Sequence, residues 1–368
     1  MARALSLAQH STGLAHPNPR VGCVIVRSGQ VFGEGFHSYV EQDHAEIVAL
    51  KKAGEKARGA TLYVNLEPCC TTGRTGPCTQ AILKAGIARV VASMKDPNPA
   101  VAGRGFVELK SAGMEVLTLD RRFEAARELN EDYAKWIQTG APFVTLKTAL
   151  TLDGQIAQRA GSVTWITSEA SRDAVQQIRH KADALVTGIG TVLADDPRLT
   201  DRTGLPRRRK LLRVVLDSKL RMPLKSKLVK SADGDLLILT SMELDSPRGR
   251  ALTRAGAEVA YMPGKRGRLD LQAAIRDLGR RQMLNVLLEA GAELNGAALE
   301  AEIVDKMILF YAPKVMGTGG VPMAQISSRL FSKLPPLTKL SVNRHDTDFS
   351  VQGYFHDVYG DYRSRRKN

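Results

Sequence analysis

Asp43-His44-Ala45-Glu46, followed by Glu67-Pro68-Cys69-Cys70 and by Cys78, is the set of segments around which the chain is organised. The set supplies one imidazole, two thiols near expected loop-to-helix junctions, and a carboxylate two residues from the imidazole. Zinc prefers nitrogen and thiolate ligands in a tetrahedron, and a catalytic zinc site keeps its fourth position for water. These segments therefore predict a zinc centre with a free carboxylate beside it.

His44, Cys69 and Cys78 are the predicted zinc ligands, and Glu46 is the predicted general acid and base. H-x-E followed by P-C-x-x-C is the signature of zinc deaminases, in which the glutamate is not a ligand. The second thiol departs from this signature, because eight residues separate Cys69 from Cys78. Residues 70–77 are therefore expected to form a loop that returns Cys78 to the metal.

Two plainer interpretations use the same residues. A structural zinc site closes with four protein ligands, and Cys70 could be the fourth, although one thiol of an adjacent pair usually points away. Alternatively, the cysteines are unconnected members of the core. The combined spacing favours the catalytic site over both.

The length and composition predict two soluble domains. At 368 residues the chain is long for one domain, and its hydrophobic fraction of 43% is ordinary for globular proteins. Four cysteines, three of them in one motif, argue against a disulfide framework and suit a reducing compartment. No apolar run approaches the roughly 18 residues that span a bilayer, and residues 1–8 lack a signal-peptide core. We expect a cytoplasmic protein, whose uncapped first helix could begin upstream of Met1.

The chain is strongly basic. Its 53 Lys and Arg residues against 38 Asp and Glu residues give a net charge of +15. Such a charge attracts nucleic acid, but phosphorylated metabolites and nucleotide cofactors are equally anionic. The excess is concentrated in residues 202–210 and 363–368, and runs of this kind are typical of solvated loops and tails. Charge alone therefore does not decide the partner.

The first half of the sequence reads as an α/β layer that ends at Gly140-Ala141-Pro142, a helix-breaking turn. We place the domain boundary there, with a zinc-dependent deaminase domain at 1–140 and a second domain at 141–368. Cys23 lies in an apolar strand and is expected in the core. The other expected elements are helices over 1–8, 44–54, 78–86 and 121–139, a hairpin over 21–35, and strands over 61–66, 88–94 and 114–119.

The second half carries two glycine-rich turns, 187–191 and 289–296, each after a strand. Strand, glycine-rich turn and helix is the layout that aims backbone amides at a phosphate, although neither turn has the G-x-G-x-x-G fingerprint. From spacing alone, an ordinary tight turn fits as well as a site for a nucleotide-sized anion. Likewise Arg179 and Arg202 read as surface arginines and Trp165 as a packing residue. The expected elements are strands over 143–149, 184–187, 213–218, 235–240, 285–289, 306–315 and 349–359, and helices over 168–181, 248–256 and 269–282.

Longer motifs resemble a known family. They are His44-Ala45-Glu46, Glu67-Pro68-Cys69, Gly73-Arg74-Thr75-Gly76-Pro77-Cys78, Asp96-Pro97-Asn98-Pro99-Ala100-Val101-Ala102-Gly103-Arg104-Gly105, Leu152-Asp153-Gly154, Thr191-Val192-Leu193-Ala194-Asp195-Asp196-Pro197, Asp217-Ser218 and Glu289-Ala290-Gly291. In this order, over essentially the whole chain, they resemble the bifunctional deaminase–reductase family of riboflavin biosynthesis. The run at 96–105 is especially specific, because most other zinc deaminases lack it.

The resemblance implies an α/β fold class with two domains and two sequential reactions. The N-terminal domain would be a cytidine-deaminase-like three-layer domain, and the C-terminal domain would be dihydrofolate-reductase-like and bind NADPH. The substrate would be a small phosphoribosyl pyrimidine, with no nucleic acid or membrane as partner and with a homo-oligomer, a dimer or a tetramer, as the assembly. One Zn²⁺ per chain and NADPH would be the cofactors.

The family pattern also implies residues for the second site. The cofactor would meet Ala149, Trp165, Thr191, Asp195, Ser218, Gly291, Ala292, Glu293, Leu294, Asn295, Gly296 and Ala297. The substrate would meet Val163, Arg179, Leu199, Arg202 and Glu289, with the two arginines on the 5′-phosphate.

Three positions depart from the family pattern. Val163 replaces a serine that commonly contacts substrate, and Thr151 replaces the serine before Leu152-Asp153-Gly154. Thr71-Thr72 stand where a polar pair with histidine is more common. The first departure weakens a substrate contact, the second is a mild change, and the third leaves the contacts of its loop open.

Three alternative functions were weighed against this one. A nucleic-acid base deaminase would leave about 220 downstream residues unexplained, and the sequence shows no aromatic-rich basic groove for stacked bases. A non-catalytic zinc module with a nucleotide-binding second half would require a closed four-ligand metal site. A deaminase with a decayed reductase half is suggested by Val163 alone.

Overall fold

The computed structural model describes residues 1–119, 124–159, 166–265, 267–327 and 332–360. The chain divides into two compact units. The first unit comprises Met1–Thr139, Pro206–Arg208 and residues from Val358 onward, and the second comprises Gly140–Leu205 and Arg209–Asp357. The expected division at residue 140 did not include the two short returning segments, because no composition change marks them in the sequence. Trp165 and Val163 lie outside the described residues.

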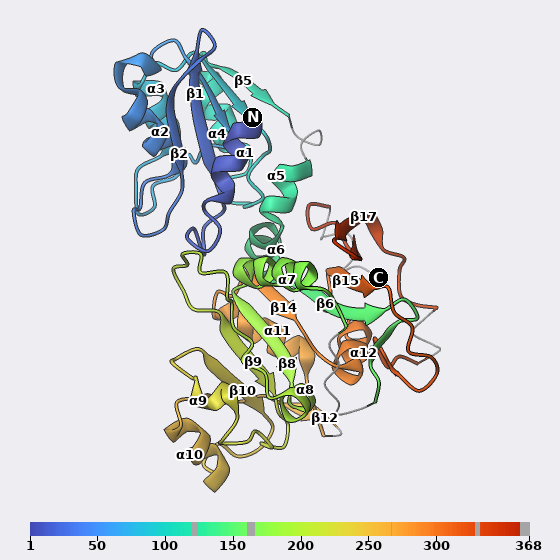
Figure 1. Ribbon diagram of the computed structural model, residues 1–368. Helices are drawn as coiled ribbons and strands as arrows, with labels where there is room; N and C mark the ends of the chain where they lie inside the picture. Colours follow the sequence, from blue (N-terminus) through green and yellow to red (C-terminus); the bar gives the residue numbers. More distant parts are fainter. Residues whose placement is uncertain (120–123, 160–165, 266, 328–331, 361–368) are drawn as a thin grey trace. The chain divides into compact units, whose positions relative to one another are not determined.

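The first unit contains a five-stranded sheet in the order β2-β1-β3-β4-β5 (Figure 1). β1 pairs antiparallel with β2 and β3, whereas β3, β4 and β5 are parallel. Its strands are β1 (Gly22–Arg27), β2 (Gln30–Phe36), β3 (Thr61–Val64), β4 (Arg89–Ala92) and β5 (Glu115–Thr118). Its helices are α1 (Ala2–Gln9), α2 (Ala45–Ala53), η1 (Gly54–Ala57), α3 (Cys78–Lys84), α4 (Arg104–Ser111), α5 (Glu124–Leu129) and α6 (Glu131–Thr139).

Helices cover both faces of this sheet, and glycines let them approach closely. A Cβ atom on Gly35 would lie 2.4 Å from the Ala45 carbonyl of α2, and one on Gly22 would lie 2.2 Å from the Ala4 carbonyl of α1. Gly35 pairs with Cys23, the neighbour of Gly22, so the two glycines face opposite sides. The result is a three-layer α/β unit in which α2 is held tightly against β2. Cys23 is fully buried in its core, as expected.

The second unit contains a nine-stranded sheet in the order β11-β10-β9-β8-β14-β6-β15-β18-β17. The strands from β11 to β15 run parallel, and β18 and β17 add an antiparallel pair at one edge. The strands are β6 (Phe143–Thr151), β8 (Ala184–Gly188), β9 (Leu212–Leu216), β10 (Leu236–Thr240), β11 (Glu258–Tyr261), β14 (Asn285–Leu288), β15 (Lys306–Ala312), β17 (Thr338–His345) and β18 (Asp348–Tyr354). The short pairs are β7 (Gln155–Ala157) with β16 (Val321–Pro322), and β12 (Gly264–Lys265) with β13 (Arg268–Leu269).

Six helices of the described residues accompany this sheet. They are α7 (Glu169–Lys181), α8 (Ile189–Asp195), α9 (Lys227–Lys230), α10 (Pro247–Arg254), α11 (Leu271–Arg280) and α12 (Ala292–Glu300). The Ser168 side chain caps α7 by accepting the Ser171 N–H, as the sequence predicted. No described helix combines the length and the apolar character needed to cross a bilayer.

Three predicted elements differ in kind from the structure, and residues 121–123 of the first lie outside the described residues. The expected helix over 121–139 is interrupted at Asn130, whose side chain accepts the Arg20 N–H at 2.7 Å and donates to the Arg20 carbonyl at 3.0 Å. The expected loop over 188–191 is instead the start of α8, which begins directly after β8. At Asn130 the side-chain bonds to Arg20 and the turn tendency of Asn outweigh the helical pattern. At residues 189–191, and at residues 292–296 of the second predicted glycine-rich turn, helical hydrogen bonds outweigh the turn tendency of Gly.

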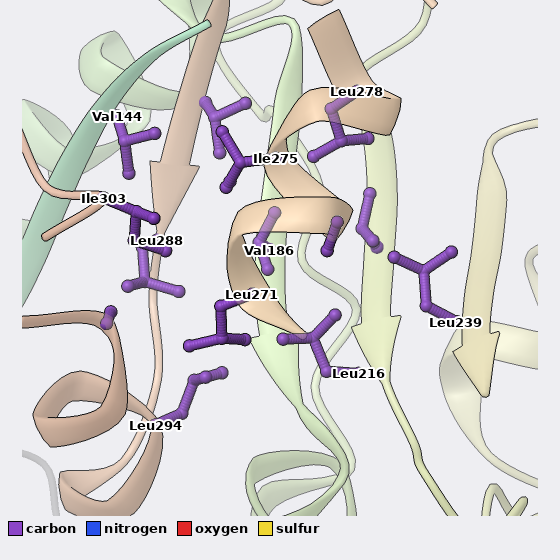
Figure 2. A pocket seen from close by; sticks show the side chains of 14 residues that line it. Val144, Val186, Leu216, Leu239, Leu271, Ile275, Leu278, Leu288, Leu294 and Ile303 are labelled. Atoms are coloured by element: carbon purple, nitrogen blue, oxygen red, sulfur yellow. The ribbon is translucent and has the colours of Figure 1, made fainter. Parts of the chain in front are cut away.

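The core of the second unit is apolar under α11. Leu271, Ile275 and Leu278 of this helix face Val186 and Leu239 of the sheet across a gap of about 10 Å³ (Figure 2). Every side chain that lines the gap is aliphatic. A space of this size holds one water molecule at most, so it belongs to the core and is not a ligand site.

Replacing Leu278 with Ala should destabilise the second unit by about 2–5 kcal/mol, because Leu278 is 1% exposed and the change leaves a cavity. The midpoint of urea unfolding, followed by circular dichroism, measures the effect. Leu340→Ala is the matched control, since Leu340 is 62% exposed, and its effect should stay within about 0.5 kcal/mol. Equal midpoints for the two variants would contradict this packing.

Candidate zinc centre and cofactor cleft

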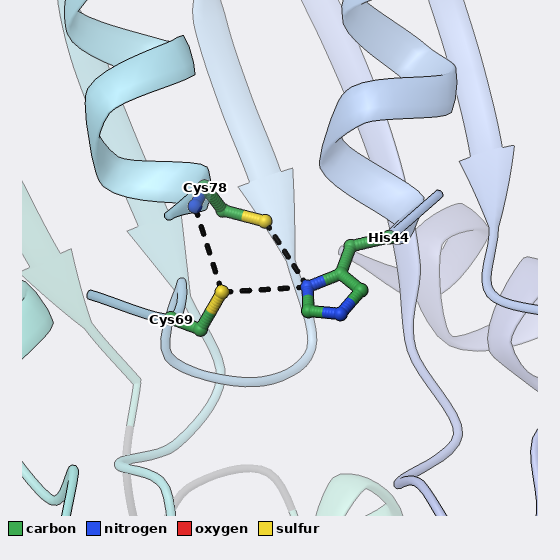
Figure 3. Close-up of side chains that lie close together, drawn as sticks. All are labelled: His44, Cys69 and Cys78. Atoms are coloured by element: carbon green, nitrogen blue, oxygen red, sulfur yellow. Dashed lines mark hydrogen bonds between the residues drawn. The ribbon is translucent and has the colours of Figure 1, made fainter. Parts of the chain in front are cut away.

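Three different elements bring the predicted zinc ligands together. His44 is the N-cap of α2, Cys78 is the first residue of α3, and Cys69 lies in the loop after β3 (Figure 3). The His44 imidazole points into the space between the two sulfur atoms. The loop over residues 70–77 returns Cys78 to the site, as the sequence predicted.

The ligand atoms have the spacing that zinc requires. His44 Nδ1 lies 3.3 Å from Cys69 Sγ and 3.3 Å from Cys78 Sγ, and all three atoms lie within 4.8 Å of one another. Tetrahedral zinc would separate nitrogen and sulfur ligands by about 3.6 Å. The three atoms therefore fit one face of the tetrahedron that would surround a Zn²⁺ ion. Cys70 does not join them within the described part of the chain.

The two thiols differ in acidity. Hydrogen bonds from Cys78 and from His44 lower the pKa of the Cys69 thiol to about 4. Hydrogen bonding to Cys69 and burial raise the pKa of Cys78. The backbone N–H of Cys78, at the start of α3, also points to Cys69 Sγ at 3.5 Å. One thiolate is thus already favoured, and zinc binding would release the proton of the other.

Glu46 lies beside the ligand group and is not a member of it. Its side chain is buried, with 3% exposure, in the first turn of α2. Burial and the Cys69 thiolate raise the pKa of Glu46 to about 7. A carboxyl group of this pKa can accept and return a proton near neutral pH, as general acid–base catalysis requires.

His37 and Asn18 adjoin the zinc centre, and sequence reasoning missed both. The His37 ring lies 5.2 Å from the His44 ring. Its Nδ1 donates to the Asp43 carbonyl at 3.0 Å, and its Nε2 accepts from Asn18 at 2.9 Å. Burial lowers the pKa of His37, which keeps it neutral. His37 therefore holds the backbone just before His44. This role depends on packing, and no sequence motif identifies it.

The second unit has a cleft of about 1320 Å³ at the carboxyl ends of its central parallel strands. This is the edge at which open α/β sheets bind ligands. Of the residues that the family pattern implied for the cofactor, those lining the cleft are Ala149, Thr191, Asp195, Ser218, Gly291, Ala292, Glu293, Leu294 and Ala297. Of those implied for the substrate, Arg179, Leu199 and Glu289 line it.

Three other predicted residues do not line the cleft. Asn295 is fully buried and donates to the Met323 carbonyl at 2.8 Å, and Gly296 packs against the backbone of Gln325. Helical periodicity turns both away from the cleft, while Leu294 and Ala297 face it. The side chain of Arg202 is exposed, and its backbone N–H donates to Gln176.

A buried ion network lies at one end of the cleft. Glu289 accepts two N–H groups of Arg179 at 2.8 and 2.9 Å, and Lys147 Nζ lies 3.0 Å from its second oxygen. Burial alone would raise the pKa of Glu289, but Lys147 and Arg179 outweigh it and lower the pKa to about 2. Lys147 was not predicted, although a lysine inside the otherwise uncharged strand β6 was a signal for it.

Comparison with known proteins defines the class of each unit. Residues 1–94 match the family model of the cytidine and deoxycytidylate deaminase zinc-binding region, and residues 142–350 match that of the RibD C-terminal domain. The chain is therefore a zinc-dependent deaminase joined to a reductase. The expected α/β fold class, with its cytidine-deaminase-like N-terminal domain, is confirmed.

Relatives and solved structures agree over nearly the whole chain. The riboflavin biosynthesis protein RibD of Escherichia coli (strain K12) is 42% identical over 352 residues, 93% of this chain and 92% of that protein. That of Aquifex aeolicus (strain VF5) is 40% identical over 319 residues, 87% of each chain. The structure of Acinetobacter baumannii RibD aligns with a TM-score of 0.84 at 36% identity, covering 96% of this chain and 97% of that one. The chain belongs to the RibD family of bifunctional riboflavin-biosynthesis enzymes, and the expected family and cofactors, zinc and NADPH, are confirmed.

Proposed function

We propose that this enzyme hydrolytically deaminates 2,5-diamino-6-(5-phosphoribosylamino)pyrimidin-4-one and then reduces the ribosyl side chain to give 5-amino-6-(5-phosphoribitylamino)uracil. The observation that carries the proposal is the His44–Cys69–Cys78 group with Glu46 beside it. A solved relative from Thermotoga maritima, 33% identical with a TM-score of 0.81 over 96% of this chain and 97% of that one, bears the name of a diaminohydroxyphosphoribosylaminopyrimidine deaminase and 5-amino-6-(5-phosphoribosylamino)uracil reductase. The test is purified enzyme with the diamino ribotide, following ammonia release and NADPH oxidation together.

In the deaminase unit, His44, Cys69 and Cys78 would hold zinc, which when bound lowers the pKa of a water molecule toward neutrality. Glu46 would accept the proton of that water as its oxygen attacks the amine-bearing pyrimidine carbon. The same carboxyl group would then deliver the proton to the departing ammonia. The buried position of Glu46 supports this role, because its pKa of about 7 suits both transfers.

In the reductase unit, NADPH supplies the hydride when bound. Gly291 and the first N–H groups of α12 would face its phosphates, as helix N-termini commonly do. Thr191 and Ser218 line the same cleft with hydroxyl groups. Lys147 and Glu289 would hold the sugar of the substrate against the cofactor.

The predicted clamp of Arg179 and Arg202 on the 5′-phosphate is part of the proposal. Arg179 donates three of its five N–H groups within the protein. Two go to Glu289 and one goes to the Thr200 carbonyl at 3.1 Å. Arg202 instead carries an exposed guanidinium at the end of the loop after Leu199. Arg179, which lines the cleft, would therefore contact the 5′-phosphate with its remaining N–H donors, and Arg202 would reach the phosphate from the loop.

Localisation and assembly are part of the proposal. The free cysteines Cys23, Cys69, Cys70 and Cys78 suit the reducing cytoplasm. A homo-oligomer is expected from the family, and analytical ultracentrifugation of the purified enzyme measures it.

Removing zinc with a chelator should abolish ammonia release, since the water molecule loses its activation. NADPH oxidation with supplied deaminated intermediate should continue at its original rate, because the cleft residues lie in the other unit. Adding one equivalent of Zn²⁺ should restore deamination. Loss of both activities on chelation, in protein that stays folded, would contradict two independent sites.

A further inference from the structure

The family-specific segment 96–105 folds around the buried carboxylate of Glu67. Its Oε2 accepts the N–H groups of Asp96 at 3.0 Å and Gly103 at 2.8 Å. Its Oε1 accepts those of Gly105 at 2.9 Å and Phe106 at 3.3 Å. Glu67 is only 2% exposed, so these four bonds replace the water that its charge would otherwise bind. Neither proposed reaction uses this residue.

Glu67 joins the first thiol segment to α4. Gly105 and Phe106 are in the first turn of this helix, where N–H groups have no partner within the helix and an anion is favoured. The next residue, Pro68, also packs closely against Gly105. A Cβ atom on Gly105 would lie only 2.2 Å from the Pro68 carbonyl, so only glycine fits there. The backbone just before Cys69 therefore packs directly against the first turn of α4.

The same helix also holds the second thiol segment. Glu108 of α4 accepts the hydroxyl of Thr79 at 3.0 Å and also bonds to Gln80. Thr79 is fully buried, directly follows Cys78, and donates its backbone N–H to the Cys69 carbonyl at 3.2 Å. One rigid element thus contacts the residues next to both sulfur ligands.

We propose that α4 is the template that sets the distance between the two zinc thiolates, and that Glu67 is the positioning residue on which this template depends. Glu67 contacts neither zinc nor substrate. It acts through Pro68 and Cys69, which it fixes against the helix that also fixes Cys78 through Glu108. Groups that orient metal ligands in this way typically change metal affinity by about 10–100-fold when replaced.

Glu67→Gln tests the role without changing size. The amide keeps one oxygen but turns its NH₂ group toward two backbone N–H donors, so two of the four bonds are lost. We expect the dissociation constant for Zn²⁺, measured by competition with a chromogenic chelator, to rise by about 10–100-fold. In Co²⁺-loaded protein, the visible absorption of tetrahedral cobalt should lose intensity or shift.

Asp183→Asn in the second unit is the matched control. Asp183 Oδ2 accepts the backbone N–H groups of Leu284 and Asn285 at 2.8 and 2.9 Å. Like Glu67→Gln, this substitution weakens carboxylate–backbone hydrogen bonds, but it does so in the unit that lacks the zinc ligands. This variant should bind Zn²⁺ and Co²⁺ like the wild type. Equal metal affinity and spectra for Glu67→Gln and wild type would overturn the proposal.

If Glu67→Gln does not fold, Glu108→Gln decides the question. Glu108 is only partly buried, and weakening its bonds to Thr79 and Gln80 should raise the Zn²⁺ dissociation constant several-fold. An unchanged constant would overturn the template role. The inference rests on the zinc ligands assigned above. Wild-type protein that binds no Zn²⁺ would refute that assignment, whereas tight binding by wild type and Glu67→Gln alike would refute only the role of Glu67.

Discussion

Glu46→Gln should lower the rate of ammonia release by about 10²–10⁴-fold, the range expected when a general acid–base group is removed. Glutamine has nearly the same size and can still accept a hydrogen bond, but it cannot take a proton from water and return it to the leaving amine. Because Glu46 lies outside the ligand group, the zinc content should stay at one ion per chain. The measurement is ammonia release under saturating diamino ribotide.

The reductase provides the internal control for this variant. NADPH oxidation with supplied deaminated intermediate should match the wild type, since Glu46 belongs to the other unit. If Glu46→Gln released ammonia at more than about a tenth of the wild-type rate, Glu46 would not be the group that transfers the protons. Simultaneous loss of both activities in folded, zinc-loaded protein would mean that the two sites are not separate.

Glu289→Gln should lower kcat/KM for NADPH-dependent reduction by about 100-fold or more. Removing one partner of a buried ion pair typically destabilises the folded state by about 3–5 kcal/mol. Here it leaves Lys147 and Arg179 without their shared anion, so we expect both side chains to leave the positions that would hold the substrate. The pKa of about 2 shows that Glu289 is held ionised, so a neutral amide is a poor substitute. Steady-state NADPH oxidation with the deaminated intermediate measures the loss.

Glu258→Gln is the matched control for Glu289. Glu258 also pairs with an arginine, Arg281, at 2.7 Å, but its side chain is 55% exposed and away from the cleft. An exposed pair contributes about 0–1 kcal/mol, so this variant should reduce substrate at nearly the wild-type rate. Comparable rates for the two variants would contradict the importance of the buried network.

The zinc centre could be predicted because its chemistry is carried by short local patterns. His44 and Glu46 occupy one helix start, and Pro68-Cys69 follows a strand, so spacing alone identified the ligand types. Cys78 required the added assumption of a loop. His37 and Glu67 could not be assigned roles, because their contacts join segments that are distant in sequence and depend on packing.

The residues proposed for the second site follow from resemblance and not from spacing. Strand, turn and helix were predicted in the right order, but the predicted turn ran to Gly296, whereas α12 begins at Ala292. The helical phase that hides Asn295 and Gly296 depends on this start and on what the helix packs against. Similarly, the pairing of Lys147 with Glu289 follows from β6 and β14 being neighbours in the sheet. Neighbouring strands that are far apart in sequence cannot be identified from periodicity.

We expect the deaminase unit to hold one zinc ion per chain, with two sulfur ligands, one imidazole ligand and one open position. Zinc K-edge X-ray absorption of the purified enzyme tests it most directly. We expect two sulfur atoms at about 2.3 Å and two nitrogen or oxygen atoms at about 2.0–2.1 Å, the second of which is water. A third sulfur atom, which would have to come from Cys70, or a chain that holds no zinc, would contradict it.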